Sequence, residues 1–226
     1  MQLPFTVDEF MSIFAMYNVS VWPAQFVLFA LALVALLCFY RNVFHTRQVV
    51  FAILSFLWAW TGMVYHIWFF SLINPFAYIF GALFVVQSLI FLYFGVIRDN
   101  VTLMPRLDLR TTFGLLLVFY ALIVYPAIGF ATGRIYPKSP TFGTPCPTTI
   151  FTFGILLFSV KRVPFYFLLI PLLWSLIGFS AAISLGIVED IGLLVFGVVS
   201  TTLLTIMKPA PIQKSNQYIN SDEKSN

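Results

Sequence analysis

The clearest candidates for chemistry in this chain are a cysteine, a histidine and two adjacent carboxylates. Cys146 lies between Pro145 and Pro147, directly before an apolar segment that begins Thr148-Thr149. At a helix N-terminus the dipole and the free N–H groups favour a thiolate, and hence a nucleophile or a soft-metal or anion ligand. The alternative is that Cys146 is a small buried residue and that Thr148 or Thr149 caps the helix.

His66 is the one histidine within an apolar segment, and an ionisable residue at membrane depth is a candidate for function. It could equally be a neutral, hydrogen-bonded residue beside Tyr65 and Trp68. Glu189 and Asp190 stand just before the last apolar segment, where carboxylates stabilise a helix start. Their alternative role is to bind a cation or to accept a proton. A single cysteine is weak evidence for a metal, so metal and cofactor stay unknown.

Composition shows what kind of molecule must position these residues. The chain has 226 residues, of which 61% are hydrophobic, 19% are aromatic and only 9% are charged. A soluble domain carries roughly a quarter of its residues as charges. A mean hydropathy of +0.97 therefore predicts an all-α integral membrane protein whose first partner is the lipid bilayer. The net charge of +4 comes from dispersed residues, which excludes a nucleic-acid partner.

Apolar runs of about 20 residues cross a bilayer as helices, and the chain contains seven apolar segments. The fifth is short, and Pro164 follows it closely, so a re-entrant hairpin with the sixth is the alternative. That alternative would place the later basic residues on the wrong side, which favours seven spans. The predicted spans are 22–40, 49–70, 77–97, 112–131, 148–160, 164–185 and 191–207.

The basic residues fall in alternate gaps between these spans. Cytoplasmic loops retain Lys and Arg during insertion, and only Arg134 and Lys138 lie in the other set of gaps. The pattern predicts an outside N-terminus and a cytoplasmic C-terminus. It also puts Cys38 and Cys146 near opposite faces, which excludes a disulfide between them. The cytoplasmic set comprises Arg41, Arg47, Arg98, Arg106, Arg110, Lys161, Arg162, Lys208, Lys214 and Lys224.

Three regions follow from this layout. Residues 1–21 form an outer amphipathic segment with a short helix over 5–18, because Thr6 and Glu9 have capping-box spacing. Residues 22–207 form the seven-helix transmembrane domain. Residues 208–226 are polar and are predicted to be a disordered cytoplasmic tail.

The unusual polar residues gather in the predicted outer half. They include the proline-rich loop 132–147, which carries Arg134 and Tyr136. A binding site, if present, opens outward, and its candidate residues are His66, Cys146, Glu189, Asp190, Arg134 and Tyr136.

The chain resembles a family of multi-pass bacterial membrane proteins catalogued as a domain of unknown function. The likeness covers residues 2–207 and is most specific in YPKSPTFGTPCPTTIFTFG at 136–154. It is also carried by LPFTVDEF near the start, VWPAQ at 21–25, YHIWFFSLINPFAYIFGALF at 65–84 and YPAIG at 125–129. The resemblance implies a bacterial inner (plasma) membrane protein and supplies no activity.

Three functions are compatible with these residues. Transport or permeation of a small solute or ion comes first, because multi-span proteins without a soluble domain most often move something. An accessory or assembly subunit, whose proline-rich outer loop docks another membrane protein, is the main alternative. A membrane enzyme that uses Cys146 as thiolate and His66 as base comes third, and it requires the second and fifth spans to be neighbours.

Overall fold

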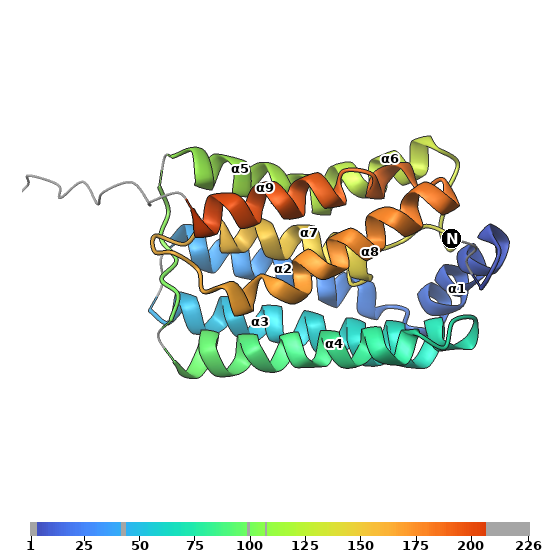
Figure 1. The fold of residues 1–226 in the computed structure, drawn as a ribbon, viewed down its shortest axis with the longest axis horizontal. Coiled ribbons are helices and arrows are strands. Elements are labelled where there is room, and N and C mark those ends of the chain that lie inside the picture. The colour runs from blue at the N-terminus through green and yellow to red at the C-terminus, as the bar shows by residue number, and fades with distance from the viewer. Residues whose placement is uncertain (1–3, 42–43, 99, 107, 207–226) are drawn as a thin grey trace, which may run out of the picture.

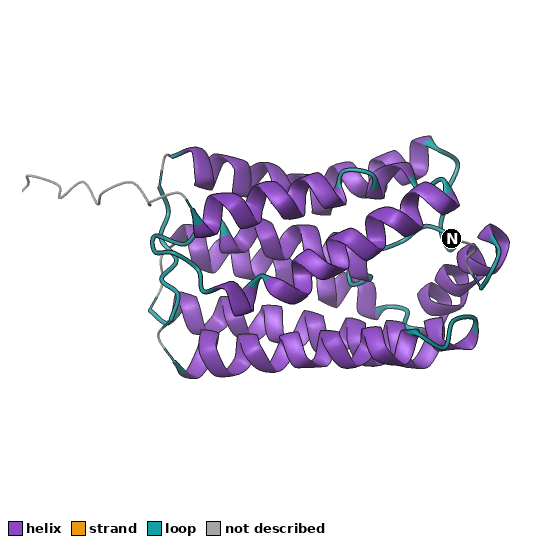
Figure 2. Cartoon of the chain, viewed as in Figure 1, coloured by secondary structure: helices purple, strands orange, loops and turns teal. Residues whose placement is uncertain are grey.

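The computed structural model describes residues 4–41, 44–98, 100–106 and 108–206, which fold into a bundle of helices (Figure 1). Within these ranges the chain consists of helices and loops with two isolated bridges and no strand (Figure 2). The all-α prediction is therefore confirmed for this part of the chain. The predicted tail, 208–226, lies outside the described residues.

Six helices of the described chain are long and apolar enough to cross a membrane. They correspond in position to six of the seven predicted spans, and they identify a multi-pass membrane protein. They are α2 (Ala24–Arg41); α3 (Thr46–Trp60) with η1 (Thr61–Phe69) and η2 (Phe70–Leu72); α4 (Ala77–Ile90) with η3 (Phe91–Ile97); α5 (Leu109–Phe119) with η4 (Tyr120–Val124) and α6 (Tyr125–Ala131); η5 (Phe165–Phe167) with α8 (Leu169–Leu185); and η6 (Val188–Asp190) with α9 (Leu193–Thr205).

The fifth predicted span differs from the others. It is α7 (Pro145–Leu156), a helix of 12 residues, which makes it about 18 Å long at ~1.5 Å per residue. A hydrocarbon core is about 30 Å thick, so α7 alone is too short to cross it. α7 begins inside the bundle (Figure 1), and every residue in it except Cys146 is buried. The seventh span therefore stays a prediction.

Small residues allow α7 to lie at the centre of the bundle, against α5, α8 and α9. Gly154 of α7 faces Gly114 of α5 so closely that a Cβ at Gly154 would lie 2.8 Å from the Gly114 carbonyl oxygen. Close backbone approach at small residues is a general means of packing helices in membranes. On another side the indole N–H of Trp58 donates a 2.8 Å hydrogen bond to the Thr152 hydroxyl, which joins α3 to α7.

The connections separate into two ends of the bundle (Figure 1). One end holds the connections that follow α2, η3 and α7. In or next to these connections lie the described basic residues that the sequence assigns to the cytoplasm, namely Arg41, Arg47, Arg98, Arg106, Arg110, Lys161 and Arg162. The other end holds α1 (Val7–Ser20) and the connections that follow η2, α6 and α8. The basic residues are thus segregated in space as well as in sequence. Which end faces the cytoplasm stays a prediction.

The predicted N-terminal helix is α1, and its capping box is present. The Thr6 hydroxyl accepts from the Glu9 N–H, and the Thr6 N–H donates to the Glu9 carboxylate at 2.7 Å. This backbone bond holds the pKa of Glu9 below its usual value. Ile13, Phe14 and Tyr17 are buried against the bundle, so α1 is an integral part of this end of the molecule.

Candidate binding site

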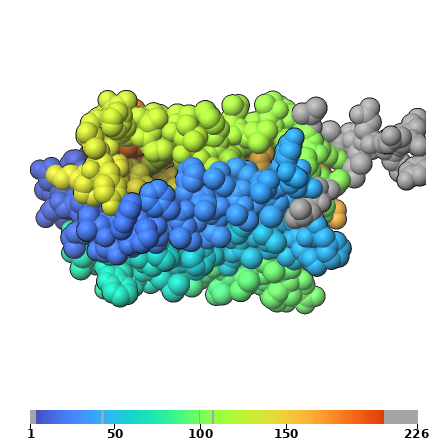
Figure 3. Space-filling model, turned by 180° about the vertical axis from the view of Figure 1, so that it is seen from behind, coloured from blue at the N-terminus to red at the C-terminus, as the bar shows by residue number. Residues whose placement is uncertain are grey.

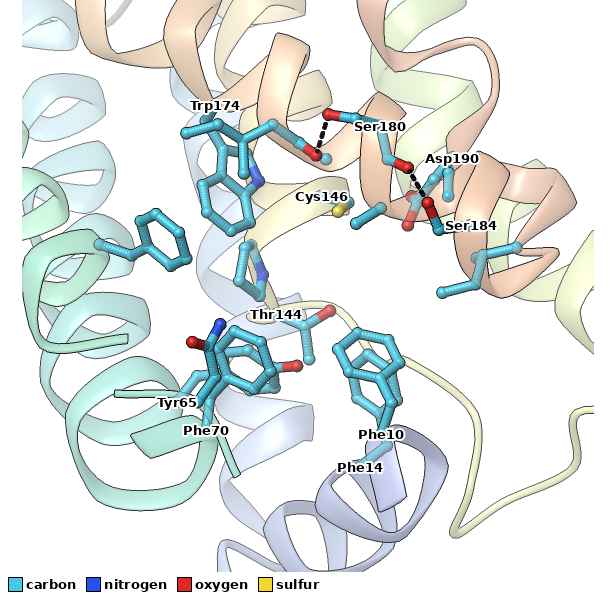
Figure 4. A pocket seen from close by; sticks show the side chains of 18 of the residues that line it. Phe10, Phe14, Tyr65, Phe70, Thr144, Cys146, Trp174, Ser180, Ser184 and Asp190 are labelled. Carbon is cyan, nitrogen blue, oxygen red and sulfur yellow. Dashed lines mark hydrogen bonds between the residues drawn. The ribbon is translucent and has the colours of Figure 1, made fainter. Parts of the chain in front are cut away.

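A cavity of about 460 Å³ lies at the α1 end of the bundle (Figure 4). Its walls come from α1, the end of the second span, α4, the start of α7, and α8. Its lining is mainly apolar and rich in aromatic rings, among them Phe5, Phe10, Phe14, Phe70, Phe80 and Trp174. A volume of this size fits a small organic molecule, since ligand pockets span roughly 300–1,000 Å³.

The rings on the α1 side form a continuous set of contacts. Phe10 packs edge-on against Phe14, with centroids 4.9 Å apart, and against Phe70, with centroids 5.7 Å apart. Phe5 stacks on Phe10 at 5.6 Å, which is the hydrophobic contact expected beside the capping box. The amphipathic pattern of α1 therefore supplies one wall of the cavity.

The loop between α6 and α7 is fixed to α1 by a buried asparagine. The amide of Asn18 donates to the carbonyls of Pro137 and Ser139, each at 2.7 Å, and its oxygen accepts from the Thr141 hydroxyl at 2.8 Å. Asn18 is fully buried. Seen from behind, this loop (yellow) lies between α1 and α2 (blue) and the α5–α6 helix (green) (Figure 3).

The last turn of the loop sets where α7 begins. The carbonyl of Gly143 accepts from the Thr61 hydroxyl at 3.0 Å and from the Tyr17 hydroxyl at 3.5 Å. Gly143 has φ of +98°, and a Cβ there would lie 2.4 Å from the Leu28 side chain, so only glycine fits. Burial raises the pKa of Tyr17 to about 12, which keeps this hydroxyl neutral.

The polar base of the cavity is built around Asp190, at the end of η6. The Tyr125 hydroxyl of α6 and the Cys146 thiol of α7 are polar neighbours of its carboxylate. Asp190 is 5% exposed, yet its Oδ1 has no hydrogen-bond partner among the residues that the structure describes. The indole N–H of Trp174, on α8, also has no hydrogen-bond partner among the described residues, and the Cys146 sulfur is its polar neighbour. Asp190, Trp174 and Cys146 are labelled in Figure 4.

Glu189, the neighbour of Asp190, is fully buried in a different environment. Arg134 forms a two-pronged ion pair with it: the Arg134 Nε donates to Oε1 at 2.9 Å, and Nη2 donates to Oε2. The Tyr120 hydroxyl donates to the Glu189 carbonyl at 2.7 Å. The pair joins η6 to the loop after α6 and cancels the charge of Glu189.

Glu189 and Asp190 lie in η6, in the first turn of the last span, where the sequence places them, although neither side chain makes a capping hydrogen bond within the described part of the chain. The predicted threonine cap, by contrast, is wrong. Thr148 and Thr149 do not cap α7, because Pro145 already occupies its first turn. Proline suits that position, since its missing N–H has no helical partner there in any case. Cys146, in the same turn, lies beside the Asp190 carboxylate and the Trp174 indole.

His66 lies in η1, behind the cavity. Its ring is enclosed by aromatic side chains, with the Trp174 ring 4.9 Å and the Phe84 ring 4.7 Å away between centroids. His66 is fully buried, and neither ring nitrogen has a hydrogen-bond partner among the described residues. It does not line the cavity, whereas Cys146 does, so this arrangement gives no support to a cysteine–histidine catalytic dyad.

The structure thus separates the six candidate residues by role. Cys146 and Asp190 meet in the cavity, Arg134 and Glu189 form the supporting ion pair, and His66 stands behind Trp174. Tyr136 lies on the loop, where its hydroxyl donates to the Asn18 carbonyl at 3.4 Å.

Sequence reasoning missed the aromatic walls and Trp174. The available signal was the row of phenylalanines on α1, together with a mid-span indole that needs a polar partner.

Comparison with known proteins points to one family. A model described as "Family of unknown function (DUF6064)" matches residues 7–211. No curated protein and no solved structure matches the chain.

Proposed function

The chain belongs to this family of unknown function, and we propose that it is a multi-pass membrane permease that binds a small solute in the Asp190 cavity. The observation that carries this proposal is a cavity within a helical bundle whose polar base contains a buried, unpartnered carboxylate oxygen. Buried polar groups are normally hydrogen-bonded. An unpartnered oxygen beside open space is therefore a position where a ligand can complete the bonding.

The non-helical segment between α6 and α7, which reaches the cavity, supports transport. Irregular backbone at membrane depth occurs where it is buried in protein or lines a cavity. Substrate sites of many transporters are built at such interrupted helices. Here the loop 135–144 leads into the bundle, and Thr144, Pro145 and Cys146 contribute the cavity wall at the start of α7.

The proposed location and orientation complete this function. The likeness to bacterial multi-pass proteins favours the inner membrane of a bacterium. The segregation of basic residues favours a cytoplasmic location for their end of the bundle, so the cavity opens toward the outside. A permease must also expose the site to the other side, which requires movement of the helices that surround α7.

Side-specific labelling of Cys146 tests this function. Cys38 and Cys146 are both free thiols, so the Cys38→Ser chain carries one reporter in the cavity. A membrane-impermeant thiol reagent is added to right-side-out and to inverted vesicles, and the Cys38→Ser/Cys146→Ala chain measures the background. We expect labelling of Cys146 from both sides, with faster labelling from the outside.

The other results decide against transport. Labelling only from the outside would overturn a permease and favour an accessory or receptor-like subunit with a permanent outer pocket. Failure to label from either side, with full labelling after denaturation, would show that the cavity is closed to solutes and would overturn the proposal entirely.

A further inference from the structure

The charges around the cavity do not balance. Glu189 is neutralised by Arg134, whereas Asp190 has no basic partner of its own among the described residues. The other outer basic residue, Lys138, is exposed on the loop. The remaining basic residues of the described chain belong to the opposite end of the bundle (Figure 1). A single buried carboxylate thus dominates the polar base of the cavity.

The start of α7 does not convert the cavity into an anion site. A helix N-terminus attracts anions through its free N–H groups. Two of the first three residues of α7, Pro145 and Pro147, have no N–H, and the Thr148 N–H is bonded to the Thr144 carbonyl at 3.3 Å. Cys146 alone offers a donor in this turn. An anion would also approach the Asp190 carboxylate directly.

The walls favour an organic cation over an inorganic one. Metal cations such as Ca²⁺ require several oxygen ligands, and no group of three or more His, Cys, Asp or Glu side chains lies together among the described residues. The walls instead present aromatic rings, chiefly Phe10, Phe14, Phe70 and Trp174. Ring faces attract ammonium groups, and the attraction strengthens when water is excluded.

We propose that the solute of this cavity is a protonated organic amine with an aromatic or apolar body, whose ammonium group binds the free oxygen of Asp190. This inference rests on the proposed function and names its substrate class. The indole N–H of Trp174 has no hydrogen-bond partner within the described chain and is a donor only, so it suits an oxygen or another acceptor on the same amine. A charged amine is also a solute that needs a protein, because a charge crosses hydrocarbon at high cost.

A matched pair of probes tests the inference. Phenethylamine is cationic at neutral pH, and 2-phenylethanol has nearly the same shape without the charge. Binding of each to the purified protein in detergent is measured by calorimetry. We expect phenethylamine to bind about tenfold or more tightly than the alcohol, as charged hydrogen bonds and cation–π contacts allow.

Variants then assign the selectivity to one carboxylate. Asp190→Asn keeps the size of the side chain and removes its charge, and it is expected to bring phenethylamine down to the affinity of the alcohol. Asp8→Asn removes an exposed carboxylate from the first turn of α1, and it should retain the preference.

Protection of Cys146 from thiol reagent in the Cys38→Ser chain gives the same comparison without altering Asp190. We expect protection by phenethylamine and none by an equal concentration of 2-phenylethanol.

Equal binding of the two probes, unchanged in Asp190→Asn, would overturn the amine assignment and leave the cavity as a site for neutral solutes. Loss of the preference in Asp8→Asn as well would also overturn it, because the selectivity would then reflect general surface charge. If neither probe binds or protects Cys146, the amine inference fails, while two-sided labelling of Cys146 still decides the permease function separately.

Discussion

The two sides of η6 bury the same chemical group in opposite ways. On the side toward α6, the Glu189 carboxylate is matched by the Arg134 guanidinium, and its backbone carbonyl accepts a bond from Tyr120. On the side toward the cavity, the Asp190 carboxylate has the Tyr125 hydroxyl and the Cys146 thiol as neighbours, and its Oδ1 has no hydrogen-bond partner among the described residues.

This difference separates a structural carboxylate from a binding one. A buried charge is tolerated when it is paired and hydrogen-bonded, and it is costly when it is not. The Arg134–Glu189 pair meets that condition within the protein and holds η6 in place. Asp190 does not meet it, and the free energy lost there is available for a ligand to recover. Substitutions of Arg134 and Asp190 compare the two carboxylates, and a substitution of Asn18 tests the opposite wall of the cavity.

Arg134→Ala should have the largest effect on stability. It leaves Glu189 buried with no opposite charge, and removal of one partner from a buried pair costs about 3–5 kcal/mol. Arg134 is 16% exposed, so we expect about 3 kcal/mol, at the lower end of that range. The free energy of unfolding in mixed micelles measures it. Lys138→Ala changes an exposed residue of the same loop and should have almost no effect.

The double variant Arg134→Ala/Glu189→Gln sharpens this result. It removes both charges, and it should recover most of the lost stability because no unpaired carboxylate remains. If the double variant is as unstable as Arg134→Ala alone, the packing of the arginine side chain, rather than the ion pair, holds η6 in place.

Asn18→Ala should have the next largest effect, on the opposite wall of the cavity. It removes three hydrogen bonds between α1 and the loop before α7, at about 1 kcal/mol each, partly replaced by water at this end of the bundle. We expect about 2 kcal/mol of destabilisation and faster proteolysis of α1. Ser20→Ala is the control. Like Asn18→Ala, it removes the glycosylation sequence Asn18-Val19-Ser20, but it changes an exposed residue and leaves these bonds intact. Equal effects of the two variants would contradict the anchoring role of Asn18.

The sequence predicts the fold of this protein better than it predicts the site. Apolar runs identify six helices, because hydrocarbon excludes unpaired backbone groups and leaves little choice but a helix. Thr6 and Glu9 identify the start of α1 through a contact three residues apart. Successive connections alternate between the two ends of the bundle, so the connections before α7 and before α9 lie at the same end and bring Cys146 and Asp190 together there. All of these depend on local pattern or on simple alternation.

The remaining features depend on contacts that no local pattern contains. Asn18 bonds to residues more than 100 positions away, and nothing in the sequence around it indicates these partners. Glu189 and Asp190 are adjacent in a 3₁₀ helix, so about 120° of rotation along the backbone decides which of them meets Arg134. The early start of α7 was detectable, since Pro145 is well suited to a first helical turn.

Asp190→Asn should have the smallest effect on stability, and that result would be the sharpest evidence for the contrast within η6. The amide keeps an acceptor for Tyr125 or Cys146 and removes a buried charge that has no opposite partner. We therefore expect the free energy of unfolding to change by less than about 1 kcal/mol, or to rise. The measurement is the same as for Arg134→Ala, in the absence of any amine. A loss close to that of Arg134→Ala would show that Asp190 is held by the protein as firmly as Glu189, and the carboxylate would then have no free capacity for a ligand. A small change combined with loss of phenethylamine binding is the pattern expected of a residue kept for its ligand rather than for the fold.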